Sequence, residues 1–171
     1  MKTSEWKLTT TQIGAIGEDV VSRGLMIASN GRFSPFKPVA DDDGIDLLIY
    51  DKKTGSALPI QVKSRLSAIK KPGKSERGNT VHFEIRDISV RSTRDDYLLA
   101  ILLDSKLRDI ERAWLIPMGE VRSVMNRVAK HKKFIMRANK SLTTKDKYKA
   151  YQVKDMAALA ERLAGIFDAG A

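Results

Sequence analysis

A carboxylate, an amide and an ammonium group occur within one short stretch of the chain, residues 41–64 (DDDGIDLLIYDKKTGSALPIQVKS). They belong to Asp46, Gln61 and Lys63. Oxygen atoms of carboxylates and amides are ligands for hard divalent cations, and a Lys ammonium can stabilise negative charge that develops during a reaction. If the fold brings these three side chains together, they could promote a reaction at an anionic group.

The same stretch has the pattern of a β-hairpin. Two apolar segments, GIDLLIY (44–50) and LPIQVKS (58–64), flank a glycine-containing turn, DKKTGS. Side chains alternate between the two faces of a strand. The alternation predicts one apolar face made of Ile45, Leu47, Ile49, Ile60 and Val62. We expect Asp46, Gln61 and Lys63 to emerge together on the opposite face.

The spacing of these residues resembles the PD-(D/E)xK nuclease superfamily, also called restriction-endonuclease-like. In its motif, an Asp at the start of one strand is followed on the next strand by an acid-x-Lys triplet. Asp46 matches the first acid and Lys63 the lysine, while Gln61 stands in place of the second acid and Ile45 in place of the proline. The segment is similar to the Gln-x-Lys branch, in the style of Holliday-junction-resolvase-like and restriction-associated members. The resemblance is good over residues 1–65 and extends to the rest only in overall pattern.

This resemblance implies an α/β fold with a restriction-endonuclease-like core, a mixed central β-sheet flanked by α-helices. It also implies a metal-dependent DNA nuclease that acts in DNA repair, recombination, restriction or defence. Mg²⁺ or Mn²⁺ would be held by Asp46, Gln61 and the backbone carbonyl of Val62. Lys63 would stabilise the charge that develops on the phosphate or position the attacking water. Many members act as dimers, so a homodimer is a further implication.

In the resolvase-like group, an acid on the first helix contributes to the metal site, and Glu18 is the matching residue. Residues 9–29 have the pattern of an amphipathic helix, which begins with a capping box formed by Thr9 and Gln12. Glu18 falls at the edge of the buried face of this helix. The alternative is an ordinary boundary carboxylate that pairs with a Lys or Arg.

The glutamine at position 61 removes one negative charge from the expected ligand set. Glu18 or an acid of the run Asp41–Asp43 would have to compensate, although that run equally suits a solvated turn. Two further functions therefore stay open. One is a nuclease-like module or complex subunit that binds DNA with little or no cleavage. The other is a basic RNA-associated domain in which the motif is coincidental.

The formal net charge of +10 is concentrated in the middle of the chain. Residues 65–154 carry 22 Lys and Arg against 10 Asp and Glu, whereas residues 1–64 carry 8 of each kind. Such a distribution favours a polyanionic partner, although a merely solvated basic surface would look the same. Two segments, 64–79 and 130–149, hold the residues we expect to contact nucleic acid: Arg65, Lys70, Lys71, Lys74, Arg77, Lys130, Lys132, Lys133, Arg137 and Lys140.

The remaining patterns predict one domain of 171 residues. Strands are expected at 80–87, 96–104 and 113–118, helices at 120–130 and 155–171, and a loop or irregular edge strand at 30–43. With no cysteine, no signal-peptide pattern and no apolar run long enough to cross a membrane, we expect a cytoplasmic protein without disulfides or thiolate metal sites.

Overall fold

The computed structural model describes residues 7–40, 44–66, 78–90 and 95–170. It begins with helix α1 (Thr10–Ala28), whose amino end has the predicted capping box. The Thr9 hydroxyl accepts a hydrogen bond from the Gln12 backbone, and the Gln12 side chain accepts one from the Thr9 backbone. The helix therefore begins where the sequence indicates.

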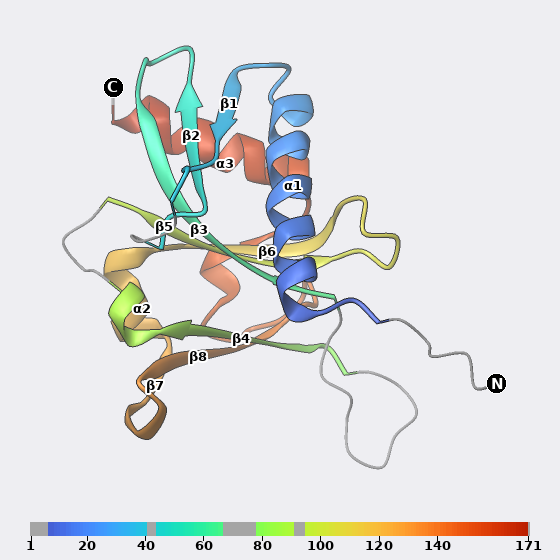
Figure 1. Cartoon of the computed structure of the whole chain (residues 1–171), viewed down its shortest axis with the longest axis vertical. Coiled ribbons are helices and arrows are strands. Elements are labelled where there is room, and N and C mark those ends of the chain that lie inside the picture. Colours follow the sequence, from blue (N-terminus) through green and yellow to red (C-terminus); the bar gives the residue numbers. More distant parts are fainter. Residues whose placement is uncertain (1–6, 41–43, 67–77, 91–94, 171) are drawn as a thin grey trace.

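A six-stranded sheet forms the centre of the fold (Figure 1). Its order is β1-β2-β3-β5-β6-β9, and only β3 and β5 run parallel, so the sheet is mixed. The strands are β1 (Phe33–Phe36), β2 (Leu47–Asp51), β3 (Ala57–Arg65), β5 (Tyr97–Leu103), β6 (Ile110–Pro117) and β9 (Gln152–Val153). The predicted hairpin is confirmed as β2 and β3, and residues 30–43 contribute an edge strand. The predicted α/β fold with a mixed central sheet is confirmed.

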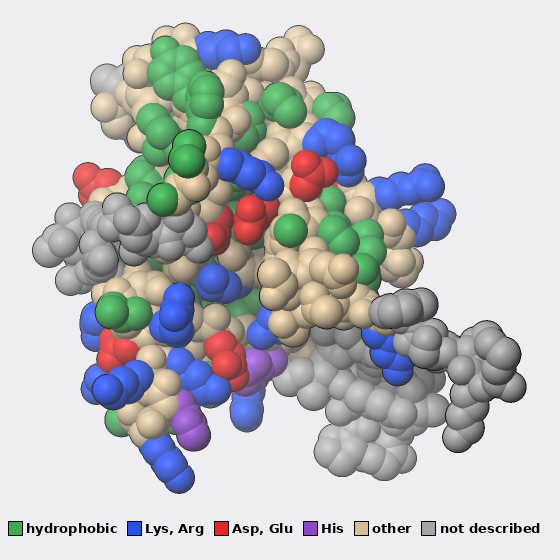
Figure 2. Space-filling view, viewed as in Figure 1, with side chains coloured by type: hydrophobic (Ala, Val, Ile, Leu, Met, Phe, Trp, Pro, Cys, Tyr) green, Lys and Arg blue, Asp and Glu red, His purple; other side chains and the backbone are tan. Residues whose placement is uncertain are grey.

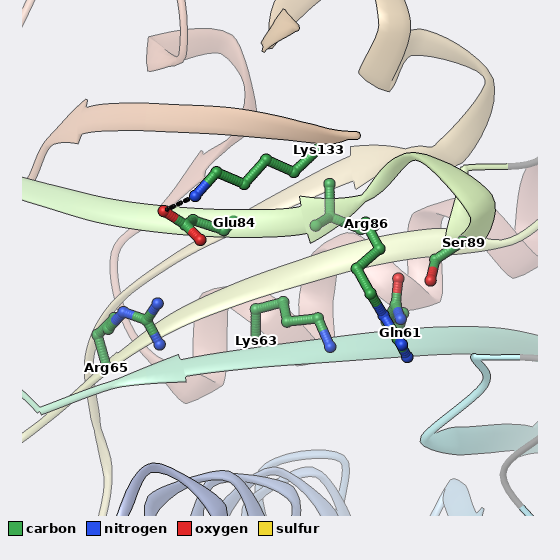
Figure 3. A pocket seen from close by; sticks show the side chains of 8 residues that line it. Gln61, Lys63, Arg65, Glu84, Arg86, Ser89 and Lys133 are labelled. Carbon is green, nitrogen blue, oxygen red and sulfur yellow. Dashed lines mark hydrogen bonds and ion pairs between the residues drawn. The ribbon is translucent and has the colours of Figure 1, made fainter. Parts of the chain in front are cut away.

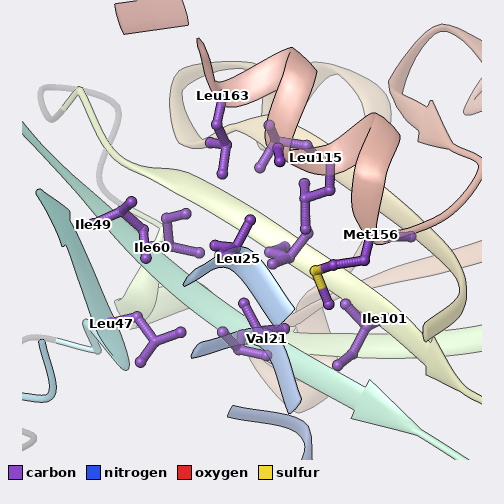
Figure 4. Close-up of a cluster of buried hydrophobic side chains, with 14 of the residues drawn as sticks. Val21, Leu25, Leu47, Ile49, Ile60, Ile101, Leu115, Met156 and Leu163 are labelled. Carbon is purple, nitrogen blue, oxygen red and sulfur yellow. The ribbon is translucent and has the colours of Figure 1, made fainter. Parts of the chain in front are cut away.

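Helices α1 and α3 (Met156–Ala169) pack on one face of this sheet. Figure 4 shows part of the apolar core between them, in which Val21 and Leu25 of α1 meet Ile60 of β3 and Leu163 of α3. Contact between α1 and β3 is close at Gly17, because a Cβ atom there would lie 1.8 Å from the Ser64 hydroxyl. A glycine at this position lets the helix lie directly on β3.

A second, three-stranded sheet covers the other face and was not expected from the sequence. Its order is β4-β8-β7, with strands β4 (Thr80–Arg86), β8 (Lys133–Asn139) and β7 (Asn126–Val128). All pairings in it are antiparallel. The buried side chains of β4 and β8 pack on the face of β5 and β6 that carries Leu98 and Trp114. The central sheet is thus covered by α1 and α3 on one side, and by the smaller sheet and the short helix α2 (Met118–Val124) on the other.

One sequence prediction in this region needs correction. The helix expected at 120–130 is α2 (Met118–Val124), and the chain then enters β7. The basic stretch 130–149 contains strand β8, in which Phe134, Met136 and Ala138 are buried. The high lysine and arginine content of this stretch obscured its period-two alternation.

Short 3-10 helices lie at Asp87–Ser89 (η1), Ala129–His131 (η2) and Lys149–Tyr151 (η3). Helix α3 begins at Asp155, whose side chain accepts a hydrogen bond from the Ala158 backbone, and it confirms the predicted carboxy-terminal helix. No helix in the described ranges has the length and apolar character needed to cross a membrane.

Candidate active site

Asp46 lies immediately before β2, where the chain begins to pair with β3. Its backbone N–H donates to the Ile60 carbonyl over 3.0 Å, and its carboxylate Oδ2 accepts a 2.6 Å hydrogen bond from the Val62 backbone N–H. In an antiparallel pair, one residue directs both its N–H and its C=O to the same neighbouring strand. The Val62 carbonyl therefore faces the same edge of β3 as the Asp46 carboxylate, so the oxygen atoms of both groups share that edge.

Gln61 is buried, with 5% of its surface exposed, and its Oε1 has no hydrogen-bond partner among the described residues. The chain passes close over its amide at Gly44, where a Cβ atom would lie 3.2 Å from Gln61 Nε2. Gly44 also has a φ of +70°, a conformation that suits glycine. A buried amide oxygen without a partner is unfavourable, so Gln61 Oε1 is a candidate to bind a ligand.

A cavity of about 270 Å³ opens between β3 and β4 (Figure 3). Lys63 extends along β3 toward Gln61 in this cavity, and its ammonium has no hydrogen bond or ion pair with the described residues. Arg86 reaches from β4 toward Gln61. The lining residues are Gln61, Lys63, Arg65, Glu84, Ile85, Arg86, Ser89 and Lys133. The cavity is therefore rich in cationic side chains and suits an anion such as a phosphate.

Two residues of the lining are held by their own contacts. Arg65 donates from Nε to the His82 carbonyl over 2.9 Å, which ties β3 to β4. Glu84 accepts hydrogen bonds from Lys133 Nζ at 2.9 Å and contacts His82 Nε2 at 2.8 Å through the same oxygen. The bond from Lys133, and then that from His82, holds the pKa of Glu84 below its ordinary value. Glu84 thus stays ionised and partly neutralises Lys133.

Glu18 does not point freely at the edge of β3. Its carboxylate lies 3.4 Å from the ammonium of Lys37, and 28% of its side chain is exposed. This contact is the ion pair expected of a boundary carboxylate. Glu18 could reach a cation only if it exchanged Lys37 for it.

The oxygen atoms at the edge of β3 determine which metal ion could bind there. Asp46 supplies a carboxylate, Gln61 a buried amide oxygen without a partner, and Val62 a backbone carbonyl. These hard oxygen donors fit Mg²⁺ or Mn²⁺, but they bring one negative charge unless Glu18 joins them. Within residues 7–40, 44–66, 78–90 and 95–170, no three His, Cys, Asp or Glu side chains are grouped to hold a metal ion. Asp41–Asp43 lie outside the described residues.

The structure therefore brings Gln61 and Lys63 into one cavity and holds Asp46 on the adjoining edge of the same strand. The expected apolar face needs one correction. Leu47, Ile49, Ile60 and Val62 belong to the core beneath α1, but Ile45 lies ahead of β2 and lines a separate apolar hollow with Phe36 and Leu48. The regular alternation of β2 begins only at Leu47.

The residues expected to contact nucleic acid divide into three groups. Lys70, Lys71, Lys74 and Arg77 lie outside the described residues. Arg65 and Lys133 line the cavity. Lys130, Lys132 and Arg137 are exposed on or beside the second sheet, while Lys140 pairs with Glu111. Figure 2 shows Lys, Arg and His side chains gathered on the lower part of the visible face, which belongs to this sheet. The prediction of a basic surface next to the motif is consistent with this arrangement.

Sequence reasoning missed the contribution of β4 to the cavity. Glu84, Arg86 and Ser89 line it, although the pattern of residues 80–87 predicts a strand and no part of a site. Alternation in that segment did separate His82, Glu84 and Arg86 from the buried residues. Nothing local indicated that the polar side lies opposite Lys63, because β3 and β4 contact each other only through the packing of two sheets.

Comparison with known proteins supports the fold. No protein-family model and no curated protein matches the chain. Among solved structures, that of a bacterial homing endonuclease aligns over 95% of this chain and 96% of its own, with a TM-score of 0.53 and 17% sequence identity. The chain thus has the fold of a protein that is an endonuclease, with Gln61 and Lys63 on the face of the central strand and Asp46 at its edge.

Proposed function

We propose that the chain is a metal-dependent DNA nuclease of the PD-(D/E)xK type, with its active site at the edge of β3. The observation that carries the proposal is the 2.6 Å hydrogen bond between Asp46 Oδ2 and the Val62 N–H. It fixes a carboxylate beside the residue that separates Gln61 from Lys63. The likeness of the fold to a bacterial homing endonuclease supports DNA as the substrate.

Each side chain has a distinct task in this proposal. Asp46, Gln61 and the Val62 carbonyl would hold Mg²⁺ or Mn²⁺, and Glu18 would join them after releasing Lys37. A bound cation supplies a water molecule of lowered pKa and offsets negative charge on the phosphate. Lys63 donates hydrogen bonds to a phosphoryl oxygen and stabilises the charge that develops there.

The surrounding cations position the backbone of the substrate. Arg86 and Lys133 line the cavity that contains Lys63, so phosphates adjoining the scissile one can bind there. Most of the affinity would come from such contacts and from the exposed basic residues of the second sheet. Binding should then weaken steeply as the salt concentration rises.

A second candidate is a DNA-binding module that has this fold and does not cut. The ion pair between Glu18 and Lys37 favours it, because a carboxylate held by an ammonium is withheld from a cation. The lack of a group of three metal-binding side chains among the described residues favours it too.

An assay of the wild-type chain separates these candidates. The protein is incubated with linear, supercoiled and branched DNA in the presence of Mg²⁺, Mn²⁺ or a chelator, and binding is measured in parallel across a salt series. Cleavage that requires the metal supports the nuclease. Salt-sensitive binding without cleavage of any substrate would instead support the binding module, and binding insensitive to salt would contradict both.

A further inference from the structure

The outer face of the second sheet carries a row of side chains of which the proposed site uses only those that line its cavity, Glu84, Arg86 and Lys133. The other partly exposed or exposed residues of this face are Thr80 and His82 on β4 and Ile135, Arg137 and Asn139 on β8. The two strands are paired antiparallel, with His82 opposite Arg137 and Arg86 opposite Lys133. No described helix packs on this face, since α1 and α3 cover the far side of the central sheet.

Arg137 and Arg86 are both exposed and have no side-chain partner among the described residues, but Arg86 lines the cavity and Arg137 does not. Lys133 is bonded to Glu84 and His82 contacts the same carboxylate. The contacts of Glu84 therefore hold the middle of the sheet face in place, while Arg137 projects beside it. The donors of a guanidinium form a rigid planar fork that matches two adjacent acceptors.

The dimensions and charge of this face match the major groove of duplex DNA. Strands β4 and β8 form a two-stranded antiparallel ribbon, and neighbouring strands lie roughly 5 Å apart. The major groove is about 12 Å wide and admits a two-stranded β-ribbon. The exposed cations Lys130 and Lys132 flank the turn into β8, where phosphates at the rim of the groove would lie.

We propose that the outer face of the β4–β8 ribbon enters the major groove of the substrate and that Arg137 reads a guanine there. The inference rests on the proposed DNA substrate and adds sequence preference to it. Arg donates two parallel hydrogen bonds to O6 and N7 of guanine, which adenine, cytosine and thymine do not accept in that arrangement. Lys130 contacts only phosphate and contributes affinity without preference.

Selection from a random duplex library tests this inference in chelator, where cleavage plays no part. The wild-type chain is expected to enrich sequences with guanine at one fixed position. Arg137→Ala should relax that position by roughly tenfold or more, the usual loss for one bidentate contact. Lys130→Ala should weaken binding equally for all sequences, and Lys106→Ala, in the exposed β5–β6 turn, should change nothing. Thermal unfolding of each variant verifies that it is folded.

A modified base identifies the groove. Replacing the selected guanine with 7-deazaguanine removes the N7 acceptor in the major groove and should weaken binding of the wild type but not of Arg137→Ala. Preference that survives Arg137→Ala, or binding indifferent to 7-deazaguanine, would overturn the inference and leave the nuclease proposal intact. If the protein shows this preference but does not cleave DNA, the nuclease proposal is overturned and the assignment of Arg137 to guanine recognition is kept.

Discussion

The carboxylate of Asp46 accepts a hydrogen bond from the backbone N–H of Val62, 2.6 Å away, at the point where β2 separates from β3. This one contact has a structural and a chemical consequence. It gives an acceptor to the Val62 N–H, which lies beyond the last residue of β3 that pairs with β2. It also holds a carboxylate beside Gln61 and Lys63. The two consequences can be separated by substitution.

Asp46→Ala should lower the free energy of unfolding by roughly 1–3 kcal/mol, because it leaves the Val62 N–H without its acceptor. Asp46→Asn keeps an oxygen in the same place and should lose less stability, although it removes the negative charge. Chemical denaturation followed by circular dichroism measures both. Equal destabilisation by the two variants would show that the charge, and not the acceptor, supports the strand junction.

Lys63→Met should reduce cleavage by about a hundredfold or more, as loss of one group that stabilises transition-state charge does. Its affinity for DNA in chelator should change little, because Arg86 and Lys133 in the cavity and the exposed cations of the second sheet remain. Single-turnover rates and binding titrations on the same duplex test this, with Lys106→Met as the matched control. A parallel loss of rate and affinity would show that Lys63 serves binding alone.

Because Glu18 and Lys37 form an ion pair, we expect substitutions of the two residues to have opposite effects on the metal requirement. Glu18→Gln should raise the Mg²⁺ concentration needed for half-maximal cleavage, because the site loses a negative charge. Lys37→Met should lower that concentration, since it frees the carboxylate from its competing ammonium. Metal titrations of the cleavage rate measure both shifts. If neither variant changes the metal requirement, Glu18 is a boundary carboxylate and has no place in the site.

Asp51 makes the stability of the fold depend on pH in the acidic range. It is fully buried at the end of β2, where Arg32 donates two hydrogen bonds of 2.8 Å to its carboxylate. These bonds hold the pKa of Asp51 well below its ordinary value. The stabilisation is therefore complete above the ordinary carboxyl pKa of about 4 and is lost as the pH falls below it toward the lowered value.

Replacing the buried carboxylate should remove that dependence. Asp51→Asn should lower the free energy of unfolding by roughly 1–3 kcal/mol at neutral pH, and the difference from wild type should shrink as the pH falls below about 4. Asp19→Asn, an exposed carboxylate on α1, is the control. A difference that stays constant down to strongly acidic pH would contradict the assignment.

Local patterns in the sequence predicted the elements that build the site. The capping box at Thr9 set the beginning of α1, and the glycine-containing turn and alternating apolar residues set the β2–β3 hairpin. Alternation also placed Gln61 and Lys63 on one face of β3, because the side-chain period of a strand is fixed at two. These are short-range properties, so one sequence is sufficient to find them.

Long-range packing could not be predicted in the same way. Strands β4 and β8 are separated by 46 residues and pair through contacts that no local pattern records. Arg86 therefore enters the cavity from a second sheet that was not expected. The Lys37 ammonium beside Glu18 depends likewise on how the chain after β1 crosses α1. The sequence shows which residues the chain contains, but it does not show which distant residues the fold brings close together.

The most direct test of the central claim is Mg²⁺-dependent DNA cleavage by the wild type and by Asp46→Asn, with affinity for the same DNA measured in chelator. Wild-type cleavage that stops when the metal is removed, and falls at least about a hundredfold in Asp46→Asn at unchanged affinity, is the predicted result, since the variant loses the carboxylate that would hold the metal. Equal cleavage by the two proteins, or no cleavage by the wild type on any DNA that it binds, would contradict an active site at the edge of β3.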